Sequence, residues 1–205
     1  TEKKILVNLG PPMDNHEIVI KDLQNKPLPE GSVGELMVSG PSVAQGYFEN
    51  IKATEEIFRQ KINGKEQFFL ATGDSALLWN GDLFFTGRIK DIIIIRGRNF
   101  YPQDIELALS KIEELRPGCL IAFSAGEENG SEHLSVGVEV RSDLLENMEV
   151  FQKYILSSID QKIIEIVMNN FQILPQERLF LEPGTISKTS SGKVKHQLNK
   201  KKFKK

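Results

Sequence analysis

Residues 87–106, GRIKDIIIIRGRNFYPQDIE, mark a change in the predicted secondary structure. Short strands and tight turns precede them, and helices mixed with strands follow. Four consecutive isoleucines in DIIIIRG (91–97) predict a stiff strand that is buried on both faces. Pro102 then begins a predicted helix, with Asp104 and Glu106 in its first turn, where proline and acidic residues are favoured. We therefore expect two structural parts that meet at about residue 90.

Short strands and tight turns dominate the residues before this boundary. The segment 16–22 (HEIVIKD) alternates polar and apolar residues, as a half-buried strand does. Another strand is predicted at 68–71, directly before Thr72-Gly73-Asp74. Two apolar runs, 76–79 and 83–86, are joined by Asn80-Gly81, which is the strongest short hairpin signal. We predict a small antiparallel barrel or a distorted sheet here.

The residues after the boundary mix helices with strands. Strands are predicted at 119–124, 134–140 and 178–181, and a long amphipathic helix at 148–171. Helices packed on a small sheet make this half α+β. The predicted fold class is therefore α+β, with a β-rich, barrel-like part at 1–89 and a small α+β domain at 90–205.

Composition excludes several classes of protein. The net charge of −2 over 205 residues argues against general binding to nucleic acid or membranes. The last thirteen residues nevertheless carry seven lysines, which form either a solvated basic helix or a patch for an acidic partner. Cys119 is the only cysteine, so neither an internal disulfide nor a cysteine metal cluster is expected, as suits a reducing cytoplasm. No segment approaches the ~20 apolar residues of a membrane span.

A lysine loop lies near the end of the sequence, in GTISKTSSGKVKH (184–196). Gly192 allows a tight turn, and Lys193 offers a mobile charge suited to an anionic group such as a phosphate. The loop is not a Walker A motif, because Ser187 stands where that motif needs glycine and Val194 where it needs Ser or Thr.

Three motifs, at 71–88, 87–106 and 187–193, resemble those of the adenylate-forming superfamily and occur in the same order. The segment RGRNFYPQDIE (96–106), together with GPSVAQGYF (40–48), is most similar to the fatty acyl-AMP ligases. The resemblance implies that 1–89 is the end of the large domain of these enzymes. It implies that 90–205 is their small mobile domain.

The resemblance assigns roles to four charged residues. Asp74 would accept hydrogen bonds from the two ribose hydroxyls of the nucleotide, and Arg88 would also reach the ribose. Taken alone, Asp74 could be an ordinary turn residue and Arg88 part of a surface ion pair. Lys90 would be the hinge between the domains, and Lys193 the catalytic lysine.

The same resemblance places Gly97, Asn99 and Tyr101 along a tunnel for a pantetheine thiol. The alternative is a packing loop before Pro102. The chain also departs from the family pattern, with Ser187 in place of the usual proline and His196 in place of the usual arginine.

The implied function is activation of a fatty acid with ATP and Mg²⁺, followed by acyl transfer to an acyl carrier protein or a carrier domain of a polyketide or nonribosomal peptide synthase. The rivals are a long-chain acyl-CoA synthetase and a non-catalytic module that docks a carrier protein through its lysines. The phosphate loop and acyl pocket of the family have no counterpart after Thr1. We therefore expect part of a longer enzyme, which does not adenylate alone.

Overall fold

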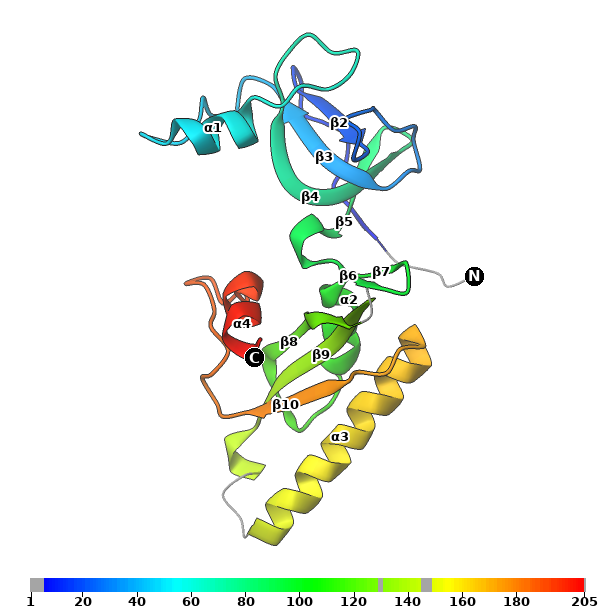
Figure 1. The fold of residues 1–205 in the computed structure, drawn as a ribbon, viewed down its shortest axis with the longest axis vertical. Coiled ribbons are helices and arrows are strands. Elements are labelled where there is room, and N and C mark those ends of the chain that lie inside the picture. Colours follow the sequence, from blue (N-terminus) through cyan, green and yellow to red (C-terminus); the bar gives the residue numbers. More distant parts are fainter. Residues whose placement is uncertain (1–5, 129–130, 145–148, 205) are drawn as a thin grey trace. The chain divides into compact units, whose positions relative to one another are not determined.

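The computed structural model describes residues 6–128, 131–144 and 149–204 (Figure 1). The chain divides into two compact units, Thr1–Lys90 and Asp91–Lys205. Helices and strands occur in both, which confirms the α+β fold class. Across the described residues, no helix combines the length and the apolar character that a membrane crossing needs.

The first unit is built on one antiparallel sheet with the strand order β1-β5-β4-β3-β2. The sheet is open, with β1 and β2 at its edges, so the expected barrel-like part is a curved sheet and not a closed barrel. A short helix precedes β4. The elements are β1 (Val7–Asn8), β2 (Glu17–Lys21), β3 (Gly34–Ser39), α1 (Ile51–Phe58), β4 (Leu70–Trp79) and β5 (Asp82–Arg88).

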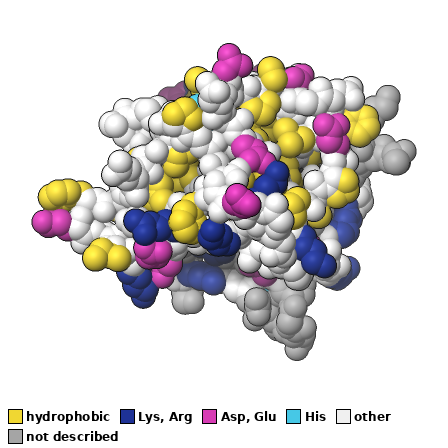
Figure 2. All heavy atoms as spheres, turned by 90° about the horizontal axis from the view of Figure 1, so that it is seen from above, with side chains coloured by type: hydrophobic (Ala, Val, Ile, Leu, Met, Phe, Trp, Pro, Cys, Tyr) yellow, Lys and Arg dark blue, Asp and Glu magenta, His cyan; other side chains and the backbone are white. Residues whose placement is uncertain are grey.

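Apolar side chains pack on both faces of this sheet. One buried cluster contains Met37 and Phe69, and the other contains Leu36 and Ala76. Neighbours such as Leu36 and Met37 fall into different clusters because successive residues of a strand point to opposite faces. On the face drawn in Figure 2, basic and acidic side chains are interspersed with hydrophobic ones.

The hairpin between β4 and β5 has the predicted two-residue turn. Asn80 and Gly81 both have positive φ, at 51° and 80°, and Trp79 pairs with Asp82 across the turn. The segment before the turn differs from prediction, because β4 runs unbroken through Thr72-Gly73-Asp74 instead of ending there. Gly73, with φ 73°, takes up the extra length in a bulge, so the strand continues.

The second unit has a three-stranded sheet with the order β10-β9-β8, in which β10 runs parallel to β9. Two helices pack with one face of the sheet around Ile105, Leu134 and Ile163, and the last helix packs near Phe123 on the other face (Figure 1). The elements are α2 (Pro102–Leu109), β8 (Leu115–Glu128), β9 (Ser131–Val140), η2 (Ser142–Leu144), α3 (Glu149–Phe171), β10 (Glu177–Leu181) and α4 (His196–Phe203).

The four isoleucines do not form the long buried strand that their composition predicts. A 3-10 turn, η1 (Ile89–Asp91), is followed by a hairpin of two short strands, β6 (Ile93–Ile95) and β7 (Arg98–Phe100). Ile93 is 1% exposed, but Ile94 is 50% exposed, so the prediction of two buried faces was wrong. Arg96 and Gly97 have φ of 50° and 74°, and this two-residue turn ends β6 after three residues.

Candidate functional site

Asp74 and Arg88 face each other across the β4–β5 ladder. The Arg88 Nε atom donates to Asp74 Oδ1 over 3.0 Å. The Asp74 side chain is 26% exposed and that of Arg88 is 65% exposed, so both groups reach solvent. A partly exposed carboxylate beside a guanidinium can accept hydrogen bonds from neighbouring hydroxyl groups.

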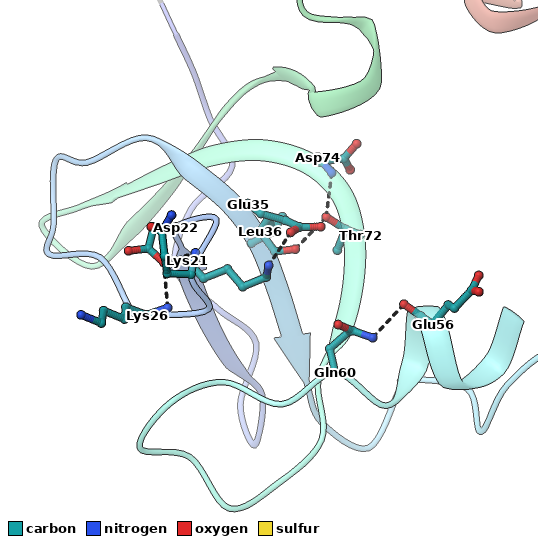
Figure 3. A network of polar contacts seen from close by, with 10 residues as sticks. Lys21, Asp22, Lys26, Glu35, Leu36, Glu56, Gln60, Thr72 and Asp74 are labelled. Carbon is teal, nitrogen blue, oxygen red and sulfur yellow. Dashed lines mark hydrogen bonds and ion pairs between the residues drawn. The ribbon is translucent and has the colours of Figure 1, made fainter. Parts of the chain in front are cut away.

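The bulge in β4 fixes the position of Asp74. Thr72 Oγ1 donates to the Leu36 carbonyl over 2.9 Å and accepts a hydrogen bond from the Asp74 backbone N–H over 3.0 Å. Figure 3 shows the Asp74 carboxylate pointing away from Thr72. The threonine hydroxyl thus anchors the backbone and leaves the carboxylate available.

The lysine loop is a small hairpin whose tip is closed by backbone bonds. Lys188 pairs with Val194, and the Thr189 N–H donates to the Lys193 carbonyl over 2.8 Å. Gly192 has φ 81°, and the Lys193 N–H donates to Thr189 Oγ1 over 3.0 Å. The turn therefore holds the Lys193 backbone while the residue itself is exposed.

The remaining predicted residues lie close to one another in sequence. Lys90 is the last residue of the first compact unit, inside η1. Gly97 forms the β6–β7 turn, Asn99 lies in β7, and Tyr101 caps the start of α2. Asp74 and Arg88 belong to the first unit, whereas Gly97, Asn99, Tyr101 and Lys193 belong to the second.

A cavity of about 520 Å³ lies within the second unit. The β6–β7 hairpin, β9 and the end of α3 line it, with Arg96, Arg98 and Phe100 from the hairpin. The residues predicted for a tunnel, Gly97, Asn99 and Tyr101, are not among its lining residues. Asn99 lies between Arg98 and Phe100 on β7, and successive residues of a strand point to opposite faces, so the Asn99 side chain faces away from the cavity.

Sequence reasoning missed a half-buried polar cluster that joins α2, β8 and α4. Glu106 Oε1 accepts a hydrogen bond from the Ala122 N–H over 3.0 Å and lies 3.5 Å from His196 Nε2. Burial raises the pKa of Glu106 to about 7, and the nearby charge of Asp91 adds to this. Burial also lowers the pKa of His196. His196 departs from the family pattern in sequence, but nothing in the sequence indicates its partner.

Glu106 should make the second unit less stable as the pH rises. Its pKa is about 7 in the folded chain and 4.5 ordinarily, so its contribution is full below about 4.5 and is lost as the pH rises through 7. Between pH 5 and 8 the loss should be about 2 kcal/mol. Hydrogen exchange of β9 amides in urea, at several pH values, would measure it.

The control for this pH effect is Glu106→Gln, which keeps the acceptor for Ala122 and removes the titration. Its stability should change less between pH 5 and 8 than that of the unaltered chain. His196 acts in the opposite sense, because its lowered pKa costs stability only as the pH falls below its ordinary value of 6.5. Identical pH profiles for the two chains would contradict the assignment to Glu106.

Comparison with known proteins agrees with the motifs. The sequence profile of the AMP-binding enzyme family matches residues 1–48. The medium-chain-fatty-acid–[acyl-carrier-protein] ligase JamA of Moorena producens is 33% identical over 98% of this chain, which covers 33% of JamA. The long-chain-fatty-acid–AMP ligase FadD26 of Mycobacterium marinum is 32% identical over 82% of this chain, which covers 28% of FadD26.

Solved structures show the same fold. The McyG A-PCP structure with phenylalanyl-adenylate superposes with a TM-score of 0.83 at 32% identity, over 99% of this chain and 34% of that one. A structure from a study of fatty acyl-adenylate ligases of E. coli and L. pneumophila gives 0.79 at 31% identity, over 97% of this chain and 32% of that one. The chain thus spans about a third of the length of the relatives it matches.

Proposed function

We propose that this chain, which belongs to the adenylate-forming AMP-binding enzymes, is part of a fatty acyl-AMP ligase. Residues 1–89 correspond to the end of the large domain, and residues 90–205 to the small mobile domain. The observation that carries the proposal is Lys193, an exposed lysine whose backbone is fixed at the tip of a hairpin. In the other unit, the Asp74–Arg88 pair offers the groups that a ribose needs.

In the first reaction step, a carboxylate oxygen of the fatty acid attacks the α-phosphorus of ATP, and pyrophosphate leaves. Negative charge accumulates on the phosphoryl oxygens in the transition state. The Lys193 ammonium stabilises this charge by bridging the acyl carboxylate and the phosphate, and it transfers no proton. Asp74 and Arg88 hold the ribose, so the α-phosphate is positioned for attack.

Mg²⁺ would accompany the ATP phosphates. Among the described residues, no group of three or more His, Cys, Asp or Glu side chains is arranged to hold a metal ion. Mg²⁺ commonly binds through substrate phosphates with only one or two carboxylates, so this arrangement fits a metal that is brought in with the nucleotide.

The second step is acyl transfer to a thiol, and it uses a different face of the small domain. The boundary between the two compact units falls directly after Lys90, as expected of a hinge. Rotation about Lys90 replaces Lys193 by the β6–β7 hairpin, where Gly97 leaves room for pantetheine beside Asn99 and Tyr101. The thiolate attacks the acyl carbonyl, and AMP leaves.

The proposed acceptor is the phosphopantetheine thiol of an acyl carrier protein or carrier domain. The name of JamA, a ligase of a fatty acid to an acyl carrier protein, supports this acceptor, and the name of FadD26, a fatty-acid–AMP ligase, supports the adenylation step. The whole enzyme, given a fatty acid and ATP, should acylate a carrier protein at least about tenfold faster than coenzyme A. Mass spectrometry of both products measures this. A faster reaction with coenzyme A would favour the acyl-CoA synthetase.

A docking module without catalysis remains the second candidate, favoured by the lysines of α4. Lys200, Lys201 and Lys202 follow one another on this helix. Replacing Lys193 by alanine in the whole enzyme distinguishes the candidates. Loss of adenylation with carrier binding intact supports catalysis, whereas loss of binding alone supports docking.

A further inference from the structure

Asn199 joins the two ends of the lysine loop. It lies in α4 and is 0% exposed. Its Oδ1 atom accepts a hydrogen bond from the Ser187 N–H over 2.9 Å. Its Nδ2 atom donates to the carbonyls of Ser187 over 2.9 Å and of Lys195 over 3.1 Å. One side chain thus holds the residues that begin and end the hairpin carrying Lys193.

The chemistry of these three contacts requires an amide. Only asparagine and glutamine carry one acceptor and two donor hydrogens on the same planar group. The Lys195 N–H also donates to the Ser187 carbonyl over 3.0 Å, so the Ser187 carbonyl is shared between the backbone and the amide. An aspartate would keep the acceptor but would place a carboxylate against two carbonyl oxygens.

The helix that carries Asn199 is itself attached to the unit at several points. In its first turn, His196 lies beside Glu106, and Gln197 Nε2 donates to Asp91 Oδ1 over 2.6 Å. In its last turn, the Phe203 ring lies 6.1 Å from that of Phe123 in β8. The loop is therefore fastened through Asn199 to a helix that is itself held at both ends.

We propose that Asn199 is a positioning residue, which sets the place of Lys193 by clamping Ser187 to Lys195. The inference rests on the proposed function, because the clamp affects catalysis only if Lys193 stabilises the charge on the acyl carboxylate and the α-phosphate of ATP. A displacement of about 1 Å at a catalytic group can cost roughly a hundredfold in rate. Asn199 touches no reacting atom and acts only through the loop.

The clamp itself is tested on the 205-residue chain by amide hydrogen exchange. Asn199→Asp keeps the shape of the side chain and removes the donor. The Lys195 and Gly192 amides, which are hydrogen-bonded within the loop, should then exchange about tenfold faster or more. Protonating the new carboxyl, toward about pH 4, should restore part of the protection relative to the unaltered chain.

The matched control is Asn170→Asp on α3, where the exposed amide donates to a carbonyl of its own helix, that of Ile166. It should leave the loop amides unchanged. Asn199→Ala provides a second variant, in which exchange at β9 reports whether the unit still folds. Unchanged exchange at Lys195 and Gly192 in the Asn199 variants would overturn the clamp.

The effect on Lys193 is tested in the whole enzyme by ATP–pyrophosphate exchange. Asn199→Asp should lower kcat about tenfold or more and change KM for ATP by less than about twofold, because the loop acts in the transition state. Faster loop exchange with an unchanged kcat would overturn the positioning role. If Lys193→Ala also left kcat unchanged, the proposed function would fail, while hydrogen exchange would still decide whether the clamp exists.

Discussion

Replacing Lys193 by alanine in the whole enzyme is expected to lower the rate of acyl-adenylate formation by at least about a hundredfold. The loss corresponds to roughly 3 kcal/mol or more of transition-state stabilisation, as is usual when one preorganised donor is removed from a site of developing charge. The fixed backbone of the loop favours a large loss, since the Lys193 N–H and carbonyl are both hydrogen-bonded to Thr189. ATP–pyrophosphate exchange with a long-chain fatty acid measures the effect.

The control for Lys193→Ala is Lys195→Ala, which removes an exposed lysine two residues along the same loop. Its effect should stay within about threefold, because general attraction of the basic segment for ATP is screened by salt. The acyl-transfer step should be less affected than adenylation, and it can be measured separately with preformed acyl-adenylate. Equal losses for the two variants would show that net charge matters and not the position of Lys193.

The 205-residue chain alone should not catalyse pyrophosphate exchange. It spans about a third of the relatives it matches, and the phosphate loop expected of the family is not in its sequence. Adenylation needs ATP, the acyl carboxylate and a catalytic lysine held together, and under the proposed assignment this chain contributes only Asp74, Arg88 and Lys193. Turnover by the purified chain would contradict this division of the site.

Sequence alone predicted the parts of the fold that depend on local rules. The Asn80-Gly81 turn was predicted because its residues tolerate positive φ, and the structure shows that geometry. The prediction that the four isoleucines form a strand buried on both faces was wrong. Composition alone did not show that the Arg96-Gly97 turn would end β6 and leave Ile94 half exposed. Burial depends on which other elements cover a strand, and such long-range packing cannot be predicted from a short segment of the sequence.

The candidate site also contains residues that local motifs predicted and residues that they did not. Asp74, Arg88 and Lys193 were predicted because each belongs to a motif that is continuous in sequence. Asn199 and Glu106 were missed because their partners lie elsewhere in the chain, as Ala122 does for Glu106. Residues that position others are recognised by three-dimensional contacts, and a single sequence gives little signal for them.

Glu139 carries the second large expected effect, on stability. Its side chain is 1% exposed, and it accepts hydrogen bonds from Arg116 Nη1 over 2.6 Å and from the Ile186 N–H over 2.7 Å. Burial alone would raise the pKa of Glu139, but the hydrogen bonds and the Arg116 charge lower it on balance. The contribution of Glu139 is therefore present above its ordinary pKa of 4.5 and is lost as the pH falls further.

Glu139→Ala should lower the free energy of unfolding of the second unit by about 3 kcal/mol at pH 7, because it leaves the buried Ile186 N–H without its acceptor and Arg116 without its partner. Hydrogen exchange of β9 amides in urea gives the value. Glu182→Ala, at an exposed position directly after β10, is the matched control and should cost less than about 1 kcal/mol. Similar losses in both variants would show that the buried contacts of Glu139 add nothing. Ile186 directly precedes Ser187, so the hydrogen bond of the Ile186 N–H to Glu139 attaches the start of the lysine loop to β9, while Asn199 attaches it to α4.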